Sequence, residues 1–537
     1  MYDTNDFKVS RRTLLLASMA TAITVGLTGR GAIAAEGEDL TIGIGQPVSS
    51  IDPHYHAQAS NTALALQLFG SLVQADGNLL PSPGLAESWT IVDDVTWEFA
   101  LRKGVRFHDG SEFDAEDVLA TFARIPNVEN ALNSFAQYIR AIEDVEVLNP
   151  HLIRFKTSAP APMLLTDLAQ VAIINRKFVA AKTDEFNNGT AAIGCGPYKL
   201  VEFIPGEFVR LERNDDYFGA KQHWATARLQ MIRAPSARTA ALLAGDVDLI
   251  DQVQIADLPE LQKKEGIVVE RKVGAFPLYL HMDQNRDVSP FITDNAGNPL
   301  SSNPLKDLRV RKALSLAIDR NAIIDRVLQG LAGPAGALMP SEIYAPTADM
   351  EPDPYDPEAA KALLAEAGFP EGFRITLHAP NERYPQGPDV AQAIAGFLTR
   401  IGVTTAVEIM PWTTYVPQAS SPNYNFSLMM FGWPSGMSSP LEFMRGALMT
   451  PNAELGFGAG NRGRYSNPQM DELVVEAFQT VDPAARDEIT VRASKLVAAD
   501  HGVVMLYYIY NLWAHRAGLA MEPRADGYTL AMMVAPL

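Results

Sequence analysis

The sequence has very little cysteine: its 537 residues contain one, Cys195. A single thiol cannot close an intrachain disulfide and cannot supply a Cys-x-x-Cys metal pair. A solitary cysteine is usually a small buried apolar residue. We therefore expect no disulfide framework and no cysteine-based metal centre, and we assign Cys195 no catalytic part.

Positive charge is also scarce. There are 44 Lys and Arg residues against 63 Asp and Glu, which gives a formal net charge of −19. So acidic a surface repels phosphate backbones and anionic lipids. After the N-terminal region, no stretch approaches the roughly 20 apolar residues that span a membrane as a helix. We therefore expect neither nucleic acid as a partner nor membrane insertion of the mature chain.

Familiar catalytic signatures are missing as well. The sequence contains no Gly-x-Ser-x-Gly elbow, no Ser-x-x-Lys, no His-Glu-x-x-His and no phosphate-binding loop. Of nine histidines, only His54 and His56 are near neighbours. No third ligand follows at a suitable spacing, so we interpret them as loop histidines at the edge of a cleft. We therefore expect neither a cofactor nor a bound metal, while an enzyme and a metal carrier that uses these histidines remain alternatives.

The N-terminus carries an export signal. Arg11 and Arg12 precede the mostly apolar run Leu14–Leu27, and Ala32-Ile33-Ala34 supplies small residues for a signal peptidase. We predict a twin-arginine signal peptide over residues 1–35. No cysteine lies near the cleavage point, so the mature chain is expected to be free in the periplasm, not lipid-anchored.

The rest of the chain alternates predicted strands and helices. A strand is expected at Leu40–Gln46, and residues 85–118 read as a hairpin followed by a helix, with His108 a structural hydrogen-bonding residue. Apolar positions three and four apart predict one amphipathic helix over 309–328, its arginines in solvent. Further helices are expected at 357–367 and 386–401, and strands at 374–379, 404–410, 426–431 and 504–513. This alternation indicates a mixed α/β protein with loops gathered at the strand ends.

Several segments occur in an order that points to a family. They are Leu85–Trp89, LRKGVRFHDG (101–110), FDAEDV (113–118), GCGPY (194–198), RNDDYFG (213–219), LLAGDVD (242–248), 305–320, AKALLAEAG (360–368) and RYSNPQMD (464–471). The set resembles the extracytoplasmic solute-binding proteins of ABC importers, in the class that includes dipeptide-, oligopeptide- and nickel-binding proteins (family 5).

The resemblance implies an α/β fold of two lobes that close on a cleft, the periplasmic-binding-protein fold. It places the first lobe at 36–275, an inserted subdomain at about 81–190, the second lobe at 276–505, and a return to the first lobe at 506–537. The implied function is to capture a peptide or peptide-like solute as a monomer and deliver it to the permease subunits of an ABC importer in the inner membrane.

Candidate ligand-binding residues lie at predicted strand ends. A strand that ends at Phe431 is followed by Gly432, Trp433, Pro434, Ser435 and Gly436. Peptide-binding relatives commonly carry an aspartate after a Gly-Trp pair, which holds the free amino group of the peptide. Counting from the tryptophan places that aspartate at Gly436, so the resemblance argues against a solute held by its free amine.

The remaining candidates are basic and aromatic. Arg383 could bind a carboxylate in a bidentate manner, and Tyr384 could stack on an apolar or planar group. A surface arginine paired with Glu382 or another acid is an equal alternative. Arg462 and Arg464 form a second basic cluster that we interpret as structural. Further aromatic and polar candidates at the cleft are Tyr55, His56, Trp412 and Tyr415. Alternative solutes are an opine-like or other anionic conjugate and a metal chelate of the nickel type.

Overall fold

The computed structural model describes residues 39–132 and 134–537, so the predicted signal peptide lies outside the described residues. The fold centres on a 12-stranded mixed sheet in the order β13-β15-β17-β12-β18-β11-β1-β10-β9-β8, with β14 on β18 and β16 on β15. Its strands are β1 (Asp39–Ile44), β8 (Tyr198–Ile204), β9 (Phe208–Arg213), β10 (Thr226–Met231), β11 (Leu249–Asp251), β12 (Ile267–Met282), β13 (Ile292–Thr293), β14 (Ala332–Pro334), β15 (Phe373–Pro380), β16 (Val403–Met410), β17 (Leu428–Gly432) and β18 (Val504–Arg516).

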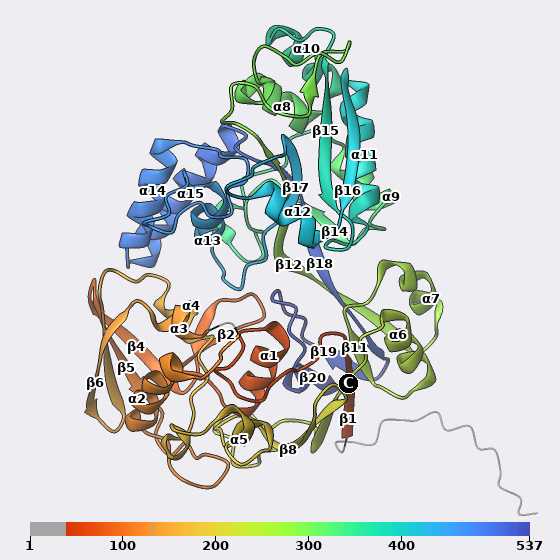
Figure 1. The fold of residues 1–537 in the computed structure, drawn as a ribbon. Helices are drawn as coiled ribbons and strands as arrows, with labels where there is room; N and C mark the ends of the chain where they lie inside the picture. The colour runs from red at the N-terminus through yellow and green to blue at the C-terminus, as the bar shows by residue number, and fades with distance from the viewer. Residues whose placement is uncertain (1–38, 133) are drawn as a thin grey trace, which may run out of the picture. The chain divides into compact units, whose positions relative to one another are not determined.

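Two long antiparallel strands, β12 and β18, connect the two halves of this sheet (Figure 1). One end of β12 pairs with β17 in the second lobe, and β18 pairs with β11 in the first. The register between β12 and β18 is interrupted between Val273 and Pro277. The backbone sheet therefore continues from one lobe to the other through a ribbon of two strands.

The first lobe contains two separate hydrophobic cores. One packs β1, β8, β9 and β10 against α1 (Ala59–Leu68) and α5 (Thr183–Asn187), and Trp513 of β18 belongs to it. The other lies beneath a four-stranded sheet in the order β4-β5-β7-β6, covered by α2 (Ala115–Arg124). That sheet consists of β4 (Ala86–Asp93), β5 (Thr96–Leu101), β6 (Ile142–Asn149) and β7 (Leu152–Thr157). It falls within the range predicted for the inserted subdomain.

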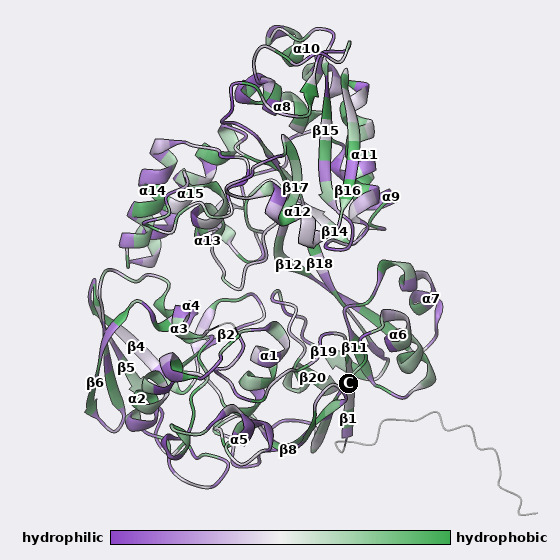
Figure 2. Ribbon diagram, viewed as in Figure 1, coloured by the Kyte–Doolittle hydropathy of each residue, from purple (hydrophilic) through white to green (hydrophobic). Residues whose placement is uncertain are grey.

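The second lobe is built on parallel strands with helices against them. β15 pairs in parallel with both β16 and β17, and α11 (Gly387–Arg400) connects β15 to β16. Figure 2 shows hydrophobic residues along these strands, while α11 and α14 also carry hydrophilic positions. The other helices of this lobe are α8 (Leu308–Leu316), α9 (Arg320–Arg326), α10 (Pro357–Glu366), α12 (Trp412–Ala419), α13 (Leu441–Phe443), α14 (Pro468–Gln479) and α15 (Pro483–Ala499).

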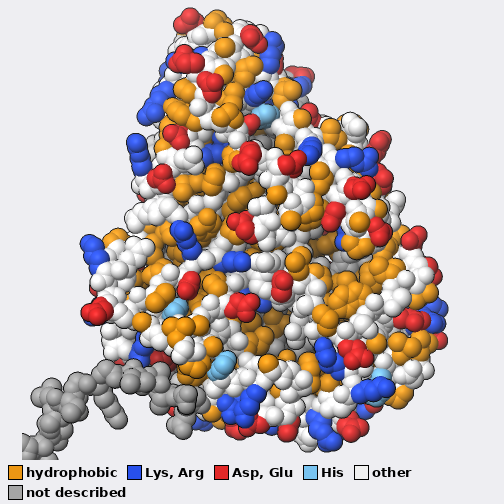
Figure 3. Space-filling model, turned by 180° about the vertical axis from the view of Figure 1, so that it is seen from behind, with side chains coloured by type: hydrophobic (Ala, Val, Ile, Leu, Met, Phe, Trp, Pro, Cys, Tyr) orange, Lys and Arg blue, Asp and Glu red, His pale blue; other side chains and the backbone are white. Residues whose placement is uncertain are grey.

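Further helices are α3 (Ala136–Ile139), α4 (Leu164–Leu168), α6 (Pro235–Ala244) and α7 (Leu258–Lys263), and further strands are β2 (Val73–Ala75), β3 (Pro81–Pro83), β19 (Leu519–Met521) and β20 (Val534–Pro536). None of the helices in the described part of the chain has the length and apolarity needed to cross a bilayer. Acidic and basic side chains are interspersed over the face drawn in Figure 3.

The predicted helix over 309–328 is wrong in two respects. It consists of two helices, α8 and α9, because Asp319 caps the second by accepting the backbone N–H of Ala322. Its arginines do not all lie in solvent: Arg311 is 8% exposed and Arg320 is 5% exposed. Both donate to backbone carbonyls from distant parts of the chain, Arg311 to Asp500 and Arg320 to Met505. A guanidinium with several donors satisfies carbonyls that the turns leave unpaired.

Candidate ligand-binding site

A cavity of about 660 Å³ lies beside β18, where loops from both lobes meet. The first lobe contributes the loop after β11, and the second lobe contributes the loop between β15 and α11. Its lining includes Gln252, Gln254, Leu328, Glu382, Arg383, Tyr384, Gln386, Tyr507, Tyr510, Asn511, Trp513 and Gly527. The volume suits a solute of drug or short-peptide size.

Tyr384 is fixed in this loop by its hydroxyl and its ring. The side chain is 4% exposed, and its hydroxyl oxygen accepts the backbone N–H of Gly432 at 2.9 Å. The ring meets Phe276 and Trp412 edge to face, with centroids 6.1 and 6.2 Å away. Burial raises the pKa of Tyr384 to about 12, so the hydroxyl remains protonated. Tyr384 therefore ties the loop after β15 to the end of β17.

Arg383 projects beside this anchored tyrosine and is exposed. Its guanidinium carbon lies 5.2 Å from the centroid of the Trp412 ring, within the range of a cation–π contact. Among the described residues no carboxylate forms an ion pair with Arg383, so the expected alternative, a pair with Glu382, does not form. The structure thus presents a guanidinium in the cavity without an acidic partner from the protein.

The loop after β17 runs along the crossing strand β12. Trp433 donates its backbone N–H to Pro277 at 3.1 Å, and Ser435 donates to Ala275 at 2.8 Å. The Trp433 ring stacks on Phe443, with centroids 5.9 Å apart and planes 12° apart. The indole is half-buried, while Pro434 and Gly436 are exposed and Ser435 is half-buried. This loop therefore lies at the interruption of the ribbon, with one indole face covered by the core.

Close packing requires a glycine at position 432. A Cβ there would lie 2.5 Å from the Phe276 ring and 3.2 Å from the Tyr384 ring. Such distances are shorter than carbon atoms tolerate, so any side chain would push these rings apart. The opposite holds at Gly436, where a Cβ would meet nothing within 4 Å.

Trp412 and Tyr415 both come from α12 but occupy different environments. Trp412 is half-buried, between Arg383 and the core. Tyr415 is fully buried, and its hydroxyl donates to the carbonyls of His378 at 3.1 Å and Met430 at 2.8 Å. Tyr415 thus packs behind the aromatic wall, in the core, and has no surface to offer a solute.

The predicted residues of the first lobe, Tyr55 and His56, are half-buried and do not line the 660 Å³ cavity. His56 places Nδ1 3.3 Å from the hydroxyl of Ser49. Neither residue is brought together with Arg383, so their part in binding stays a prediction.

His54 is not a loop histidine at a cleft edge, contrary to expectation. It is fully buried, with Nε2 2.8 Å from the Ala172 carbonyl and Nδ1 2.9 Å from Arg124. Arg124 also forms a bidentate ion pair with Asp52, in which Nη1 lies 2.9 Å from Oδ1 and Nη2 lies 2.7 Å from Oδ2. Burial and the nearby Arg124 lower the pKa of His54 to about 4. Both ring nitrogens are engaged, and the described residues include no group of three His, Cys, Asp or Glu side chains that could hold a metal.

His108 has the structural role predicted for it. Its Nε2 lies 3.1 Å from the Gly196 carbonyl, and its Nδ1 lies 3.3 Å from the backbone nitrogen of Gly194. It fastens the loop that precedes β8.

The sequence did not single out the amide side chains of the cavity. Gln252 and Gln254 follow β11, Gln386 precedes α11, and Asn511 belongs to β18. Tyr507 also lines the cavity, and its buried hydroxyl has no hydrogen-bond partner within the protein as described. Asn511 lies in a predicted strand and Gln386 begins a predicted helix, but no predicted element marked Gln252 or Gln254. Together they offer hydrogen bonds to a polar, uncharged part of a solute.

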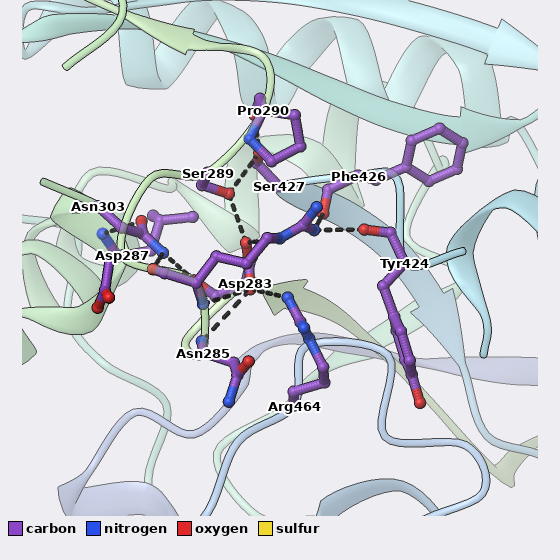
Figure 4. A network of polar contacts seen from close by, with 12 residues as sticks. Asp283, Asn285, Asp287, Ser289, Pro290, Asn303, Tyr424, Phe426, Ser427 and Arg464 are labelled. Carbon is purple, nitrogen blue, oxygen red and sulfur yellow. Dashed lines mark hydrogen bonds and ion pairs between the residues drawn. The ribbon is translucent and has the colours of Figure 1, made fainter. Parts of the chain in front are cut away.

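A buried polar network supports the loop 461–465 of the second lobe (Figure 4). At its centre is Asp283, 1% exposed, which accepts from Arg286 at 2.7 Å, Ser289 at 2.6 Å and Arg464 at 2.8 Å. Asn303 donates to the Asp283 carbonyl at 2.7 Å. Arg464 is therefore structural, as predicted from the sequence. Arg462, two residues earlier, does not take part in this network.

Comparison with known proteins gives the family. Residues 81–454 match the bacterial extracellular solute-binding proteins, family 5. The chain belongs to this family. It is 27% identical to heme-binding protein A of Haemophilus influenzae, over 87% of this chain and 85% of that protein. It is 26% identical to the periplasmic oligopeptide-binding protein OppA of Salmonella typhimurium, over 96% of this chain and 94% of that protein.

Solved structures agree on the fold of this solute-binding protein. HbpA2 from Haemophilus parasuis superposes with a TM-score of 0.80 at 22% identity, covering 93% of this chain and 100% of that one. The unliganded open form of the murein tripeptide-binding protein MppA gives 0.78 at 22% identity, covering 94% and 98%. The predicted two-lobed periplasmic-binding-protein fold is confirmed.

Proposed function

We propose that this protein captures a peptide or peptide-like solute between its two lobes and delivers it to the permease of an ABC importer. Relatives that align along most of the chain include oligopeptide- and dipeptide-binding proteins. The observation that carries the proposal is the cavity beside β18, to which both lobes contribute and which contains Arg383 with no acidic partner among the described residues. The protein acts as a binding protein, not an enzyme.

Arg383 binds a carboxylate of the solute. A planar guanidinium matches a carboxylate with two parallel hydrogen bonds, which are stronger than bonds between neutral groups. Trp412 restrains the guanidinium from one side, and Tyr384 fixes the loop that carries it. Tyr507, Tyr510 and Trp513 line the cavity and supply apolar surface for the rest of the solute. The half-buried rings of Trp412 and Trp433 lie outside that lining and could contact only a part of the solute that extends beyond it.

The exposed Gly436 favours a second candidate class, an opine-like or other anionic conjugate. No acid stands at this position, and the next one in sequence, Glu442, is already paired with Arg445 at 2.8 Å. A free amino group would therefore lack a carboxylate partner in this loop. Solutes whose amine is blocked or substituted lose nothing by that absence.

Binding couples to closure through the ribbon of β12 and β18. A solute that contacts Gln252 or Gln254 on one lobe and Arg383 on the other binds the closed form more tightly than the open form. The pairing of β12 with β18 lapses between Val273 and Pro277, where the loop after β17 donates to Ala275 and Pro277 instead, so the ribbon bends there. The closed form is then the state that the permease recognises.

Export and assembly complete the proposal. Residues 1–35 direct the chain through the twin-arginine pathway, and the mature protein works as a monomer in the periplasm.

A thermal-shift screen tests this function. Unblocked peptides, N-acetylated peptides, opines, sugars and metal chelates are compared, and the best hit is titrated by calorimetry against the wild type, Arg383→Gln and the exposed control Arg326→Gln. We expect a peptide or an anionic conjugate to stabilise the protein. Loss of one charge-assisted contact should weaken binding about tenfold or more in Arg383→Gln, with no change in the control.

Failure of every peptide and conjugate to shift the melting temperature would contradict the proposal. Recovery of the bound solute chemically unchanged after prolonged incubation separates binding from catalysis.

A further inference from the structure

Arg462 is a second arginine of the second lobe without an acidic partner. The side chain is half-buried, and one Nη donates to the Gly460 carbonyl at 3.0 Å. Its Nε is enclosed and has no hydrogen-bond partner, and within the described residues no carboxylate forms an ion pair with it. A guanidinium that is partly withdrawn from water, with one enclosed N–H unpaired and no counter-ion, gains from an added anion.

The two unpaired guanidinium groups stand at the ends of one series of aromatic contacts. Arg462 lies over the face of Phe431, with its guanidinium carbon 4.4 Å from the ring centroid. Phe431 meets Trp412 edge to face at 5.9 Å, and Trp412 lies beneath Arg383 at 5.2 Å. Both guanidinium groups therefore pack on one cluster of aromatic rings, in which Phe431 is buried and Trp412 is half-buried. Arg383 lines the 660 Å³ cavity and Arg462 lies outside that lining.

Trp433 is the neighbour of Arg462 in this cluster. A Cβ on Gly460 would lie 2.9 Å from the indole of Trp433 and 3.4 Å from Nη1 of Arg462, so the indole edge and the guanidinium flank the same glycine. Arg462 is thus placed beside the loop that follows β17, the segment from which the acid expected at Gly436 is missing.

The backbone around Arg462 is held rigidly. Asn461 donates its side-chain amide to the carbonyls of Leu448, Met449 and Tyr465, and it accepts the N–H of Tyr465. On the other side Arg464 is tied to the buried Asp283 (Figure 4). Because Asn461 and Arg464 on either side are fixed, the backbone position of Arg462 is set before any solute arrives, which lowers the entropic cost of binding.

We propose that Arg462 forms a second anion-binding subsite, and that the natural solute carries two acidic groups, one on Arg383 and one on Arg462. The segment between its acidic groups lies across Trp412 and beside Trp433. This inference rests on the proposed function and narrows it to a class: peptides or amino-acid conjugates acylated or alkylated with a second carboxylate.

The test compares matched probes on the mature full-length protein. One dipeptide is prepared in N-succinyl and N-succinamyl forms, which have the same shape but differ by one negative charge. Oxalyl and glutaryl versions, with their amides, vary the spacing of the carboxylates. Calorimetry gives the ratio of affinities of each acid to its amide for the wild type, Arg462→Gln, Arg462→Lys and the control Arg326→Gln, with melting temperatures to confirm folding.

We expect one spacing at which the wild type and the control prefer the acid by about tenfold or more. The preference should fall to near one in Arg462→Gln and be partly retained in Arg462→Lys. An acid-to-amide ratio near one at every spacing, with the unblocked or acetylated dipeptide still binding, overturns this inference alone. If no form of the dipeptide binds, the result contradicts the proposed capture of peptides, and with it the inference about Arg462.

Discussion

The hydroxyl of Tyr384 accepts the backbone N–H of Gly432 at 2.9 Å, which joins the loop after β15 to the last residue of β17. These two loops carry Arg383 and Trp433. The position of the guanidinium relative to the indole is therefore set by one hydrogen bond and by the rings packed around it, not by the loops themselves.

Replacement of Gly432 by alanine should disturb this junction. The added Cβ would lie 2.5 Å from Phe276, so the rings of Phe276 and Tyr384 must move apart. Overpacking of this kind costs about 1–3 kcal/mol of unfolding free energy. Urea unfolding measures the loss, and calorimetry with the best solute should show weaker binding. Gly436→Ala is the matched control, because its Cβ would meet nothing within 4 Å; equal effects of the two variants would contradict this account.

An aspartate at position 436 should change which solutes bind. The space around Gly436 accommodates the side chain, and its carboxylate would offer an ion-pair partner to a free amine. We expect Gly436→Asp to gain affinity for unblocked dipeptides relative to their N-acetyl forms by about tenfold. Gly436→Asn, of equal size but uncharged, serves as the comparison. If both variants behave alike, the absent acid is not what sets the preference at the amine.

Removal of the buried Arg320 should cost much more stability than removal of an exposed arginine. Arg320 donates to the carbonyls of Met505 and Ser315, and burial lowers its pKa to about 10. Arg320→Met leaves these buried carbonyls without a donor, at a cost of about 3 kcal/mol. Chemical unfolding should place Arg326→Met, on the exposed side of α9, close to the wild type. A wild-type-like Arg320→Met would show that water replaces the guanidinium.

Asp167 should make stability depend on pH near neutrality. Burial, and then the nearby Glu442, raises the pKa of this carboxyl to about 7 in the folded protein. Because the folded pKa lies above the unfolded one, the stability it contributes is present at low pH and is lost as pH rises through about 7. Asp167→Asn should therefore raise the melting temperature at about pH 8 more than at about pH 4.5. The exposed Asp94→Asn should show no such difference between the two pH values; a parallel response of the two variants would contradict the raised pKa.

Motifs and periodicity predicted which segments form helices and strands. They predicted less well where a helix ends and which polar side chains are buried. The strands at 374–379, 404–410 and 426–431 correspond to β15, β16 and β17. The helix over 309–328 divides at Asp319, since a capping side chain can end one helix and begin the next without interrupting the apolar pattern. Arg311 and Arg320 lie off the apolar stripe, yet they are buried because carbonyls 189 and 185 residues away reach them.

The sequence predicted residues of the candidate site only where they directly follow a predicted strand. Arg383, Tyr384 and Trp433 follow predicted strands, and the loops that carry them are joined in the structure. The cavity is also lined by Gln252 and Asn511, which come from distant parts of the chain. Local sequence patterns do not predict such long-range proximity. Tyr415 fails as a wall residue for the same reason: helical spacing does not show that its hydroxyl is taken by His378 and Met430.

The ribbon of β12 and β18 also determines how the polypeptide could be divided. A cut near Ala275 would yield an N-terminal fragment whose β11 lacks its neighbour β18, and a C-terminal fragment with the complementary unpaired edge. Open edges of this kind invite aggregation when left uncovered. Neither fragment should therefore remain soluble when produced separately, whereas coexpression should let the two reconstitute one particle by edge-to-edge complementation. Two lobes are visible in the fold, but they do not amount to two independently foldable units.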